Sequence, residues 1–391
     1  MIRRLMLAAV LATFVPACGA PPKPVKKVHK EPKVDTKSMV ADARDAARAG
    51  DYDGADKKYA AAYQASHSFD VLEEYVDFLL HNGRAQKGVD ASKTYYDANM
   101  ADAKGYALYA EALLDDEQGS KALEVAQGMI DLDDKNAAGH EKKGRALILL
   151  GKEEGLEELR KAVSLDKDNA TYNVSLGRAL FELGKVDEAA LAFRQAVKTE
   201  PENADAHVYL GMALRGQSEY DEAKSHLQKA IDIDPHNGRA YFELGLIAGL
   251  QNKADEAEQA LAKAVKTSPN ESLFWYAYGE VFRSTDRLDE ALSAYRKSVE
   301  LDPPYPKALQ KLGLILVERK QYDEAEVVLT QAIRRDKNAP VNYLNLGLVY
   351  AAEKKNQLAI DNLEHFLQIA PKTDADRGKA KDTLNDLKRK K

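Results

Sequence analysis

Apolar and small residues recur along this chain at spacings of three and four, with polar residues between them. From residue 144 to residue 366 the pattern itself repeats, once after 33 residues and otherwise after 34. In each period a glycine is followed eleven or twelve residues later by a small residue, and four residues after that by a larger apolar one. Such spacings place side chains on one face of an α-helix. The pattern therefore predicts two amphipathic helices in each period.

The repeated glycine is predicted to lie at a close contact between the two helices. A glycine inside a helix costs about 0.5 to 1 kcal/mol relative to alanine, so its recurrence requires compensation. We expect it to face the small residue of the second helix. Acidic pairs such as Asp187-Glu188 stand where that helix begins, and prolines such as Pro201 stand where it must end. The repeated glycines are Gly144, Gly177, Gly211, Gly245, Gly279, Gly313 and Gly347.

Two periods match a known signature especially well. The matching positions are Trp275, Tyr278, Gly279, Phe282, Ala291, Tyr295 and Pro303 in one period, and Tyr343, Leu346, Gly347, Tyr350, Ala359, Leu363 and Pro371 in another. This pattern resembles the tetratricopeptide repeat. The resemblance implies an all-α, right-handed α-solenoid of about ten helical hairpins. We predict such repeats over residues 137–373, degenerate repeats over 38–136, and a capping helix over 374–391.

The N-terminus has the pattern of an export signal. Arg3 and Arg4 are followed by an apolar run over residues 5–15, which is too short to span a bilayer. Residues 1–17 are therefore predicted to be a signal peptide. The residues that end at Cys18 resemble a bacterial lipobox, whose cysteine is acylated and becomes the mature N-terminus. The alternative is ordinary signal cleavage after Gly19.

Residues 18–37 are predicted to form a tether rich in proline and lysine, without apolar periodicity. Its lysines either contact anionic lipid headgroups or belong to a solvated spacer. Gly19 resembles the residue that directs lipoproteins to the outer membrane rather than the inner one. We therefore expect a lipid-anchored protein of the bacterial cell envelope, with its body in the periplasm.

Composition and motifs argue against several classes of function. The formal net charge is −6, which disfavours nucleic acid as a partner, and the single cysteine excludes an intramolecular disulfide. The histidines are scattered, and the apparent phosphate loop at 177–185 has the wrong glycine spacing. Asp131, Asp133 and Asp134 lack the remaining ligands of a calcium loop. We predict no enzymatic activity, cofactor or metal.

The resemblance places protein partners in a concave groove lined by the first helix of each hairpin. With the repeated glycine as position eight, positions 5, 6, 9 and 12 are expected to face this groove. Aromatic residues, methionine and arginine, which are enriched in interface hot spots, occupy several of these positions. The alternative for each is packing against the next repeat. The predicted groove residues are Arg178, Phe181, Tyr209, Met212, Arg215, Phe242, Tyr276 and Arg283.

The resulting functional hypothesis is a lipid-anchored scaffold that assembles or stabilises an envelope complex. It resembles pilotin-type repeat lipoproteins of type IV pili and, more loosely, repeat lipoproteins of outer-membrane protein assembly. The alternatives are an adaptor for cell-wall enzymes and a periplasmic module that binds peptide or glycan. Chaperone-tail binding is not supported, because Lys307 and Lys311 match the carboxylate clamp of that subfamily while Phe242, Leu246 and Ala277 do not.

Overall fold

The computed structural model describes residues 35–301 and 305–389. The predicted signal peptide, Cys18 and nearly all of the predicted tether lie outside these ranges. All regular structure in the described residues is α-helical. The described residues form two compact units, which divide between Arg84 and Ala85.

The first unit contains three described helices, of which α1 and α2 form a helical hairpin and α3 packs against α2. Because α1 already begins at Thr36, its first two residues fall within the predicted tether. The bounds are α1 Thr36–Arg48, α2 Tyr52–Ser66 and α3 Phe69–His81.

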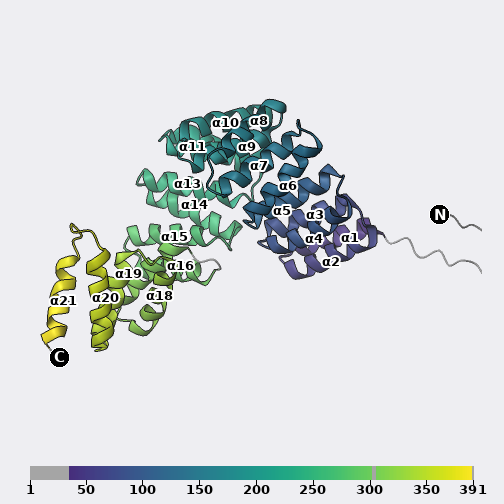
Figure 1. Ribbon diagram of the computed structural model, residues 1–391. Coiled ribbons are helices and arrows are strands. Elements are labelled where there is room, and N and C mark those ends of the chain that lie inside the picture. Colours follow the sequence, from purple (N-terminus) through teal and green to yellow (C-terminus); the bar gives the residue numbers. More distant parts are fainter. Residues whose placement is uncertain (1–34, 302–304, 390–391) are drawn as a thin grey trace, which may run out of the picture. The chain divides into compact units, whose positions relative to one another are not determined.

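The second unit contains eighteen helices, α4 to α21, and follows the chain from blue to yellow in Figure 1. They are α4 Ala85–Ala98, α5 Ala103–Asp115, α6 Gly119–Leu132, α7 Ala137–Leu149, α8 Gly155–Leu165, α9 Ala170–Glu182, α10 Val186–Thr199, α11 Ala204–Gly216, α12 Tyr220–Ile233, α13 Gly238–Leu250, α14 Ala254–Thr267, α15 Ser272–Ser284, α16 Leu288–Glu300, α17 Pro306–Glu318, α18 Tyr322–Arg335, α19 Pro340–Ala352, α20 Asn356–Ile369 and α21 Arg377–Arg389.

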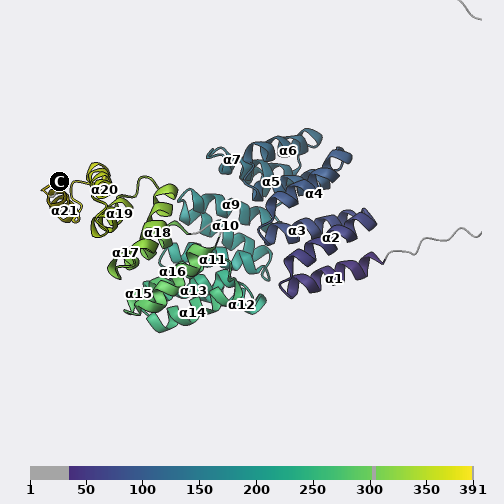
Figure 2. The same ribbon diagram turned by 90° about the horizontal axis from the view of Figure 1, so that it is seen from below.

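From α5 onward the helices pair into hairpins that stack in chain order. Each odd-numbered first helix packs against the even-numbered second helix that follows it, and each second helix packs against the next first helix (Figure 2). First helices also contact one another directly, as in the run α5, α7, α9, α11, α13 and α15. The last helix, α21, packs on α20 and α19. The second unit is thus an all-α solenoid that ends in a capping helix, as the sequence predicted.

The repeated glycine does lie at the contact within each hairpin, but its nearest neighbour differs from the prediction. A Cβ atom added to Gly177 would lie 2.5 Å from Phe193, and one added to Gly211 would lie 2.7 Å from Leu227. The glycine therefore accommodates the larger apolar residue of the second helix, four residues after the alanine that we expected. The larger side chain projects back along its helix toward the crossing point, whereas the methyl group of alanine is too short to fill it.

Local sequence explains where the first helices begin. The side chains of Asn136, Asn169, Asn203 and Asn237 each accept a hydrogen bond from a backbone N–H in the first turn of α7, α9, α11 and α13. This satisfies one of the N–H groups that a helix start leaves without a partner. Each of these first helices therefore begins one residue after its asparagine.

Candidate functional site

Four of the eight predicted groove residues line one recess on the first helices of three successive hairpins. Arg178 and Phe181 come from α9, and Tyr209 and Met212 come from α11. Arg239 of α13 completes the wall, and the recess has a volume of about 260 Å³. We call these five residues, together with Phe193 and Glu182, the arginine–tyrosine recess.

Tyr209 is at the centre of this recess. Its ring stacks on the ring of Phe193 from α10, with centroids 5.5 Å apart and planes 15° apart. Phe193 is 1% exposed, since it is the residue that packs against Gly177. The close helix contact within the α9–α10 hairpin therefore fixes the platform on which Tyr209 rests.

Two arginines approach Tyr209 from the neighbouring hairpins. The Cζ atom of Arg178 lies 5.5 Å from the ring centroid and that of Arg239 lies 5.9 Å from it, both within cation–π range. Both side chains are exposed. In the described part of the chain, neither guanidinium forms an ion pair or a hydrogen bond with another residue. Their hydrogen-bond donors are therefore available to a partner.

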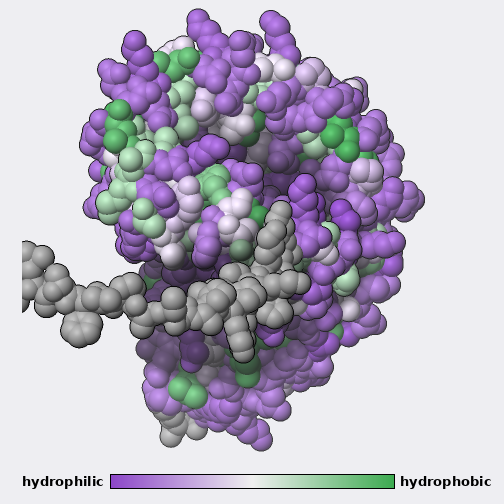
Figure 3. Space-filling view, turned by 90° about the vertical axis from the view of Figure 1, so that its right-hand side faces the viewer, coloured by the Kyte–Doolittle hydropathy of each residue, from purple (hydrophilic) through white to green (hydrophobic). Residues whose placement is uncertain are grey.

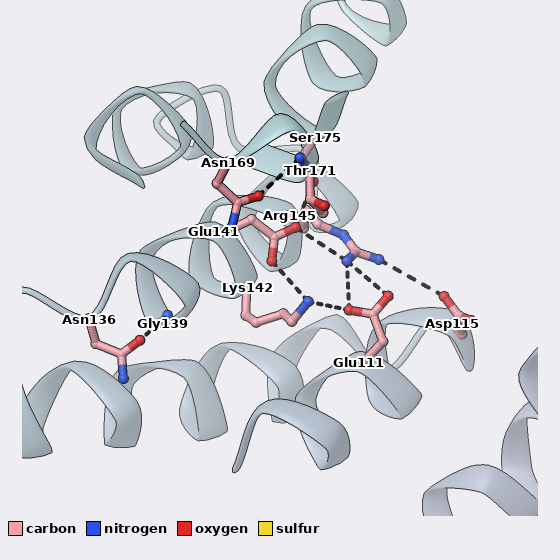
Figure 4. Close-up of polar contacts among 10 residues, drawn as sticks. All are labelled: Glu111, Asp115, Asn136, Gly139, Glu141, Lys142, Arg145, Asn169, Thr171 and Ser175. Atoms are coloured by element: carbon pink, nitrogen blue, oxygen red, sulfur yellow. Dashed lines mark hydrogen bonds and ion pairs between the residues drawn. The ribbon is translucent and has the colours of Figure 1, made fainter. Parts of the chain in front are cut away.

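A second group, of four charged residues and one serine, comes from the successive first helices α5, α7 and α9 (Figure 4). Lys142 Nζ is 2.9 Å from a carboxylate oxygen of Glu141, and it also contacts Glu111. Arg145 binds Glu111 at 2.8 Å and Glu141 at 3.3 Å. The hydroxyl of Ser175 donates to Glu141 at 2.6 Å. We call these five residues the ionic cluster.

The charges of the ionic cluster are paired with one another, and they are partly buried except for Glu141, which is fully buried. The side chain of Glu141 is 1% exposed. Burial opposes the charged form of Glu111, but Lys142 and Arg145 outweigh it and lower the pKa of that carboxyl to about 2. Burial also opposes the charged forms of Glu141 and Lys142, but the neighbouring opposite charges outweigh it. The pKa of Glu141 is therefore below its ordinary value, and the pKa of Lys142 is above its own. Two carboxylates thus balance two cations, and the cluster joins three helices.

Family comparison identifies the repeats. Tetratricopeptide repeat profiles match residues 151–204, 174–238 and 214–281. This is a tetratricopeptide-repeat protein. Residues 267–370 also match the middle tetratricopeptide-like domain of cilia and flagella-associated protein 70. No curated protein matches the chain in sequence.

Solved structures of other tetratricopeptide proteins share this fold at low sequence identity. Yeast Tom70 is 15% identical, with a TM-score of 0.50, and the alignment covers 91% of this chain and 96% of that one. Cut9 in the Cut9–Hcn1 complex is 16% identical, with a TM-score of 0.52 and coverage of 90% and 76%. Human IFIT1, crystallised with PPP-AAAA, is 17% identical, with a TM-score of 0.52 and coverage of 87% and 91%. These similarities establish the fold alone.

The other predicted groove residues of this tetratricopeptide protein have partners within the chain. Arg215 donates to Glu243 at 2.7 Å, and Arg283 pairs with Glu280 at 3.1 Å. Phe242 is 5% exposed and stacks on Phe274, with centroids 4.5 Å apart, so it packs between repeats.

Tyr276 is half-buried between Tyr295 and Tyr305, with ring centroids at 5.9 and 4.8 Å. Burial, followed by the nearby carboxylate of Glu280, raises its pKa to about 12. Tyr276 therefore belongs to an aromatic contact of its own, and it does not line the arginine–tyrosine recess.

Sequence reasoning missed Arg239 and the ionic cluster. Arg239 stands at position 2 of its repeat and lines the recess, whereas the groove was predicted from positions 5, 6, 9 and 12. Glu141 stands at position 5, where Val174 and Val208 occupy the following repeats. The available signal was a charged residue at a position that is apolar or aromatic in the next four repeats.

Metal-binding groups and membrane-spanning helices were sought in the described residues. In residues 35–301 and 305–389, no group of three or more histidine, cysteine or acidic side chains is placed to hold a metal ion. None of the described helices is long and apolar enough to cross a membrane. On the face shown in Figure 3, hydrophilic residues predominate and hydrophobic residues form small separate patches.

Proposed function

We propose that this protein is an envelope-anchored scaffold, and that it binds an extended segment of a protein partner in the arginine–tyrosine recess. The proposal is carried by one observation: residues from three successive first helices converge on one recess, with an aromatic ring at its centre. Buried aromatic platforms flanked by arginine are typical of interface hot spots. A recess of about 260 Å³ is smaller than the roughly 300–1,000 Å³ of typical small-molecule sites, which favours a side chain of a polypeptide.

The contacts of Tyr209 favour peptide over glycan. A sugar ring stacks on a free aromatic face, but Tyr209 already stacks on Phe193 and has two guanidinium groups beside it. The edge of the ring and the arginine donors remain accessible, and they suit carbonyl and carboxylate groups better than a sugar.

Photo-crosslinking in cells tests the groove. A photoreactive amino acid replaces Met212 in the recess or, as a control, exposed Gln195 on the second helix α10. We expect a discrete adduct from position 212 and none from position 195. Equal adducts from both positions, or none from position 212, would refute the recess as the binding site.

The anchor has its own test. Cells are labelled with an alkyne analogue of palmitate, and membrane and soluble fractions of wild type and Cys18→Ala are compared. Acylation of Cys18 predicts a labelled membrane form in the wild type and an unlabelled soluble form of the variant. An unlabelled wild-type protein would favour ordinary cleavage after Gly19 and would remove the anchor from the proposal.

A further inference from the structure

The two unpaired arginines define the chemistry of the bound segment. We infer that the arginine–tyrosine recess selects an acidic side chain next to a large apolar one in an extended segment of the partner. This inference rests on the proposed function and specifies the class of its ligand.

Arg145 and Arg178 occupy position nine of successive repeats, but their surroundings differ. Arg145 binds Glu111 and Glu141 and lies 3.9 Å from Asp115. In the next repeat, Val174 stands where Glu141 stood, and the residue at position nine of the preceding helix is Arg145 rather than an acid. In the described residues, Arg178 therefore forms no ion pair.

The side chains that line the recess carry more positive than negative charge. Glu243, which faces Arg239 from the same helix, already accepts a hydrogen bond from Arg215. Among the residues that line the recess, Glu182 is the one carboxylate, against the guanidinium groups of Arg178 and Arg239. The recess is thus locally cationic on a chain with a net charge of −6. A carboxylate offers the planar pair of acceptors that a guanidinium binds most strongly.

An apolar surface lies beside the two arginines. Phe181 and Met212 line the same recess as the arginines, and Phe193 lies beneath. An acidic residue alone would leave this surface exposed to water. A neighbouring large apolar side chain would cover it, and methionine adapts to side chains of different shape.

Nucleic acid fits these observations less well. A phosphate backbone is recognised by several basic residues along a track, and its bases stack on free aromatic faces. The recess has two arginines, and one face of its ring is already occupied by Phe193. A single carboxylate matches what is available.

The test is selection from random ten-residue peptides displayed on phage, using the purified full chain as bait. Three proteins are compared: wild type, the double variant Arg178→Gln with Arg239→Gln, and Arg160→Gln. Arg160 is an exposed arginine of α8 paired with Glu188, so its variant controls for loss of surface charge. Circular dichroism verifies that all three are folded. We expect Asp or Glu beside Phe, Leu, Ile or Met to be enriched by the wild type and the control, and not by the double variant.

A selected peptide and its twin with the acid replaced by its amide are then titrated by fluorescence anisotropy. We expect the acidic form to bind wild type about tenfold or more tightly than the amide form, and the two to bind the double variant equally. The preference should weaken as salt rises, because it is electrostatic. Single-stranded octa-adenylate is the competitor, and we expect it not to displace the peptide.

Four results would overturn the inference: no peptide enriched, enrichment without acids, a preference that survives in the double variant, or displacement by octa-adenylate at lower concentration than by unlabelled peptide. The proposed function is judged separately by the crosslink at position 212. If that crosslink forms while acids are not selected, the groove binds a partner of different chemistry. If the crosslink is absent, the proposed function itself fails.

Discussion

The ionic cluster and the arginine–tyrosine recess lie on adjoining first helices of one solenoid, yet they use arginine in opposite ways. In the cluster, Arg145 is held by carboxylates of its own chain, whose charges it neutralises. In the recess, Arg178 has no carboxylate partner in the described part of the chain and lies beside an aromatic ring. The same repeat position thus stabilises the stack in one hairpin and is open to a partner in the next. Repeat position alone does not decide the role of a residue, because the neighbouring repeat supplies or withholds its partner.

The largest effect is expected from breaking the ionic cluster. Glu141→Ala would leave Lys142 and Arg145 with one fewer carboxylate and Ser175 without its acceptor. Removing one partner of a buried ion pair typically costs about 3–5 kcal/mol, because the remaining charge is uncompensated. Urea unfolding followed by circular dichroism, with hydrogen exchange of α7 and α9, measures the change.

The matched control removes a carboxylate from the recess. Glu182 is exposed and lines the recess, so Glu182→Ala is expected to change stability by no more than about 0.5 kcal/mol. Similar losses in the two variants would mean that the ionic cluster has no special structural role.

The next effect concerns the platform beneath Tyr209. In Gly177→Ala the new Cβ atom would lie 2.5 Å from the ring of Phe193, which must move although it is fully buried. Overpacking of this kind typically costs about 1–3 kcal/mol. Because Phe193 supports Tyr209, partner binding should weaken together with the thermal stability, which differential scanning calorimetry measures.

A second helical glycine provides the control for this prediction. A Cβ atom added to Gly249 in α13 would meet nothing within 4 Å. Gly249→Ala should therefore stabilise the protein by about 0.5–1 kcal/mol, since alanine is the better helix former. A destabilised Gly249→Ala, or an unchanged Gly177→Ala, would contradict the role assigned to the close helix contact.

The sequence was sufficient to predict the hairpins. It was not sufficient to predict which residues on the first helices pair within the chain and which remain available to a partner. Helical spacing and the recurring glycine predicted the stack, because these features depend on neighbours within one repeat. Phe242 shows the limit: its position predicted the groove, but Phe274 of the next hairpin covers it. Arg215 was likewise predicted to be available, and Glu243 one hairpin later binds it. Pairing between repeats depends on which two side chains meet, and a periodic pattern read one repeat at a time does not contain that information.

A smaller change in stability and a measurable loss of binding are expected from Tyr209→Ala. Loss of the stacked pair with Phe193 removes about 0.5–1.5 kcal/mol, whereas loss of a hot-spot side chain weakens binding by about tenfold or more. Tyr276→Ala removes a comparable aromatic contact outside the recess. It should leave binding of a selected peptide unchanged in the same anisotropy titration. If both variants lose binding equally, the bound segment extends well beyond the recess.

The smallest effect is a difference in acid sensitivity between the two regions. His226 of α12 lies beside His207 of α11, with their Nδ1 atoms 2.9 Å apart. Burial and then His207 lower the pKa of His226 below its ordinary value of 6.5, with Arg194 acting in the same direction and Glu222 against it. The folded state therefore resists a proton that the unfolded chain accepts, so stability is lost as the pH falls below about 6.5.

The ionic cluster should respond in a lower pH range. The pKa of Glu111 is lowered from 4.5 to about 2, so its contribution is present above pH 4.5 and is lost only as the pH falls toward 2. Hydrogen exchange at pH 7 and pH 5.5, corrected for intrinsic rates, should therefore show weaker protection of α11 and α12 at the lower pH and unchanged protection of α7. In His226→Asn the difference at α11 and α12 should disappear, because asparagine does not titrate. Equal loss of protection at α7 and α12 would instead indicate that a charge shared by the whole solenoid, and not the histidine pair, governs the response to acid.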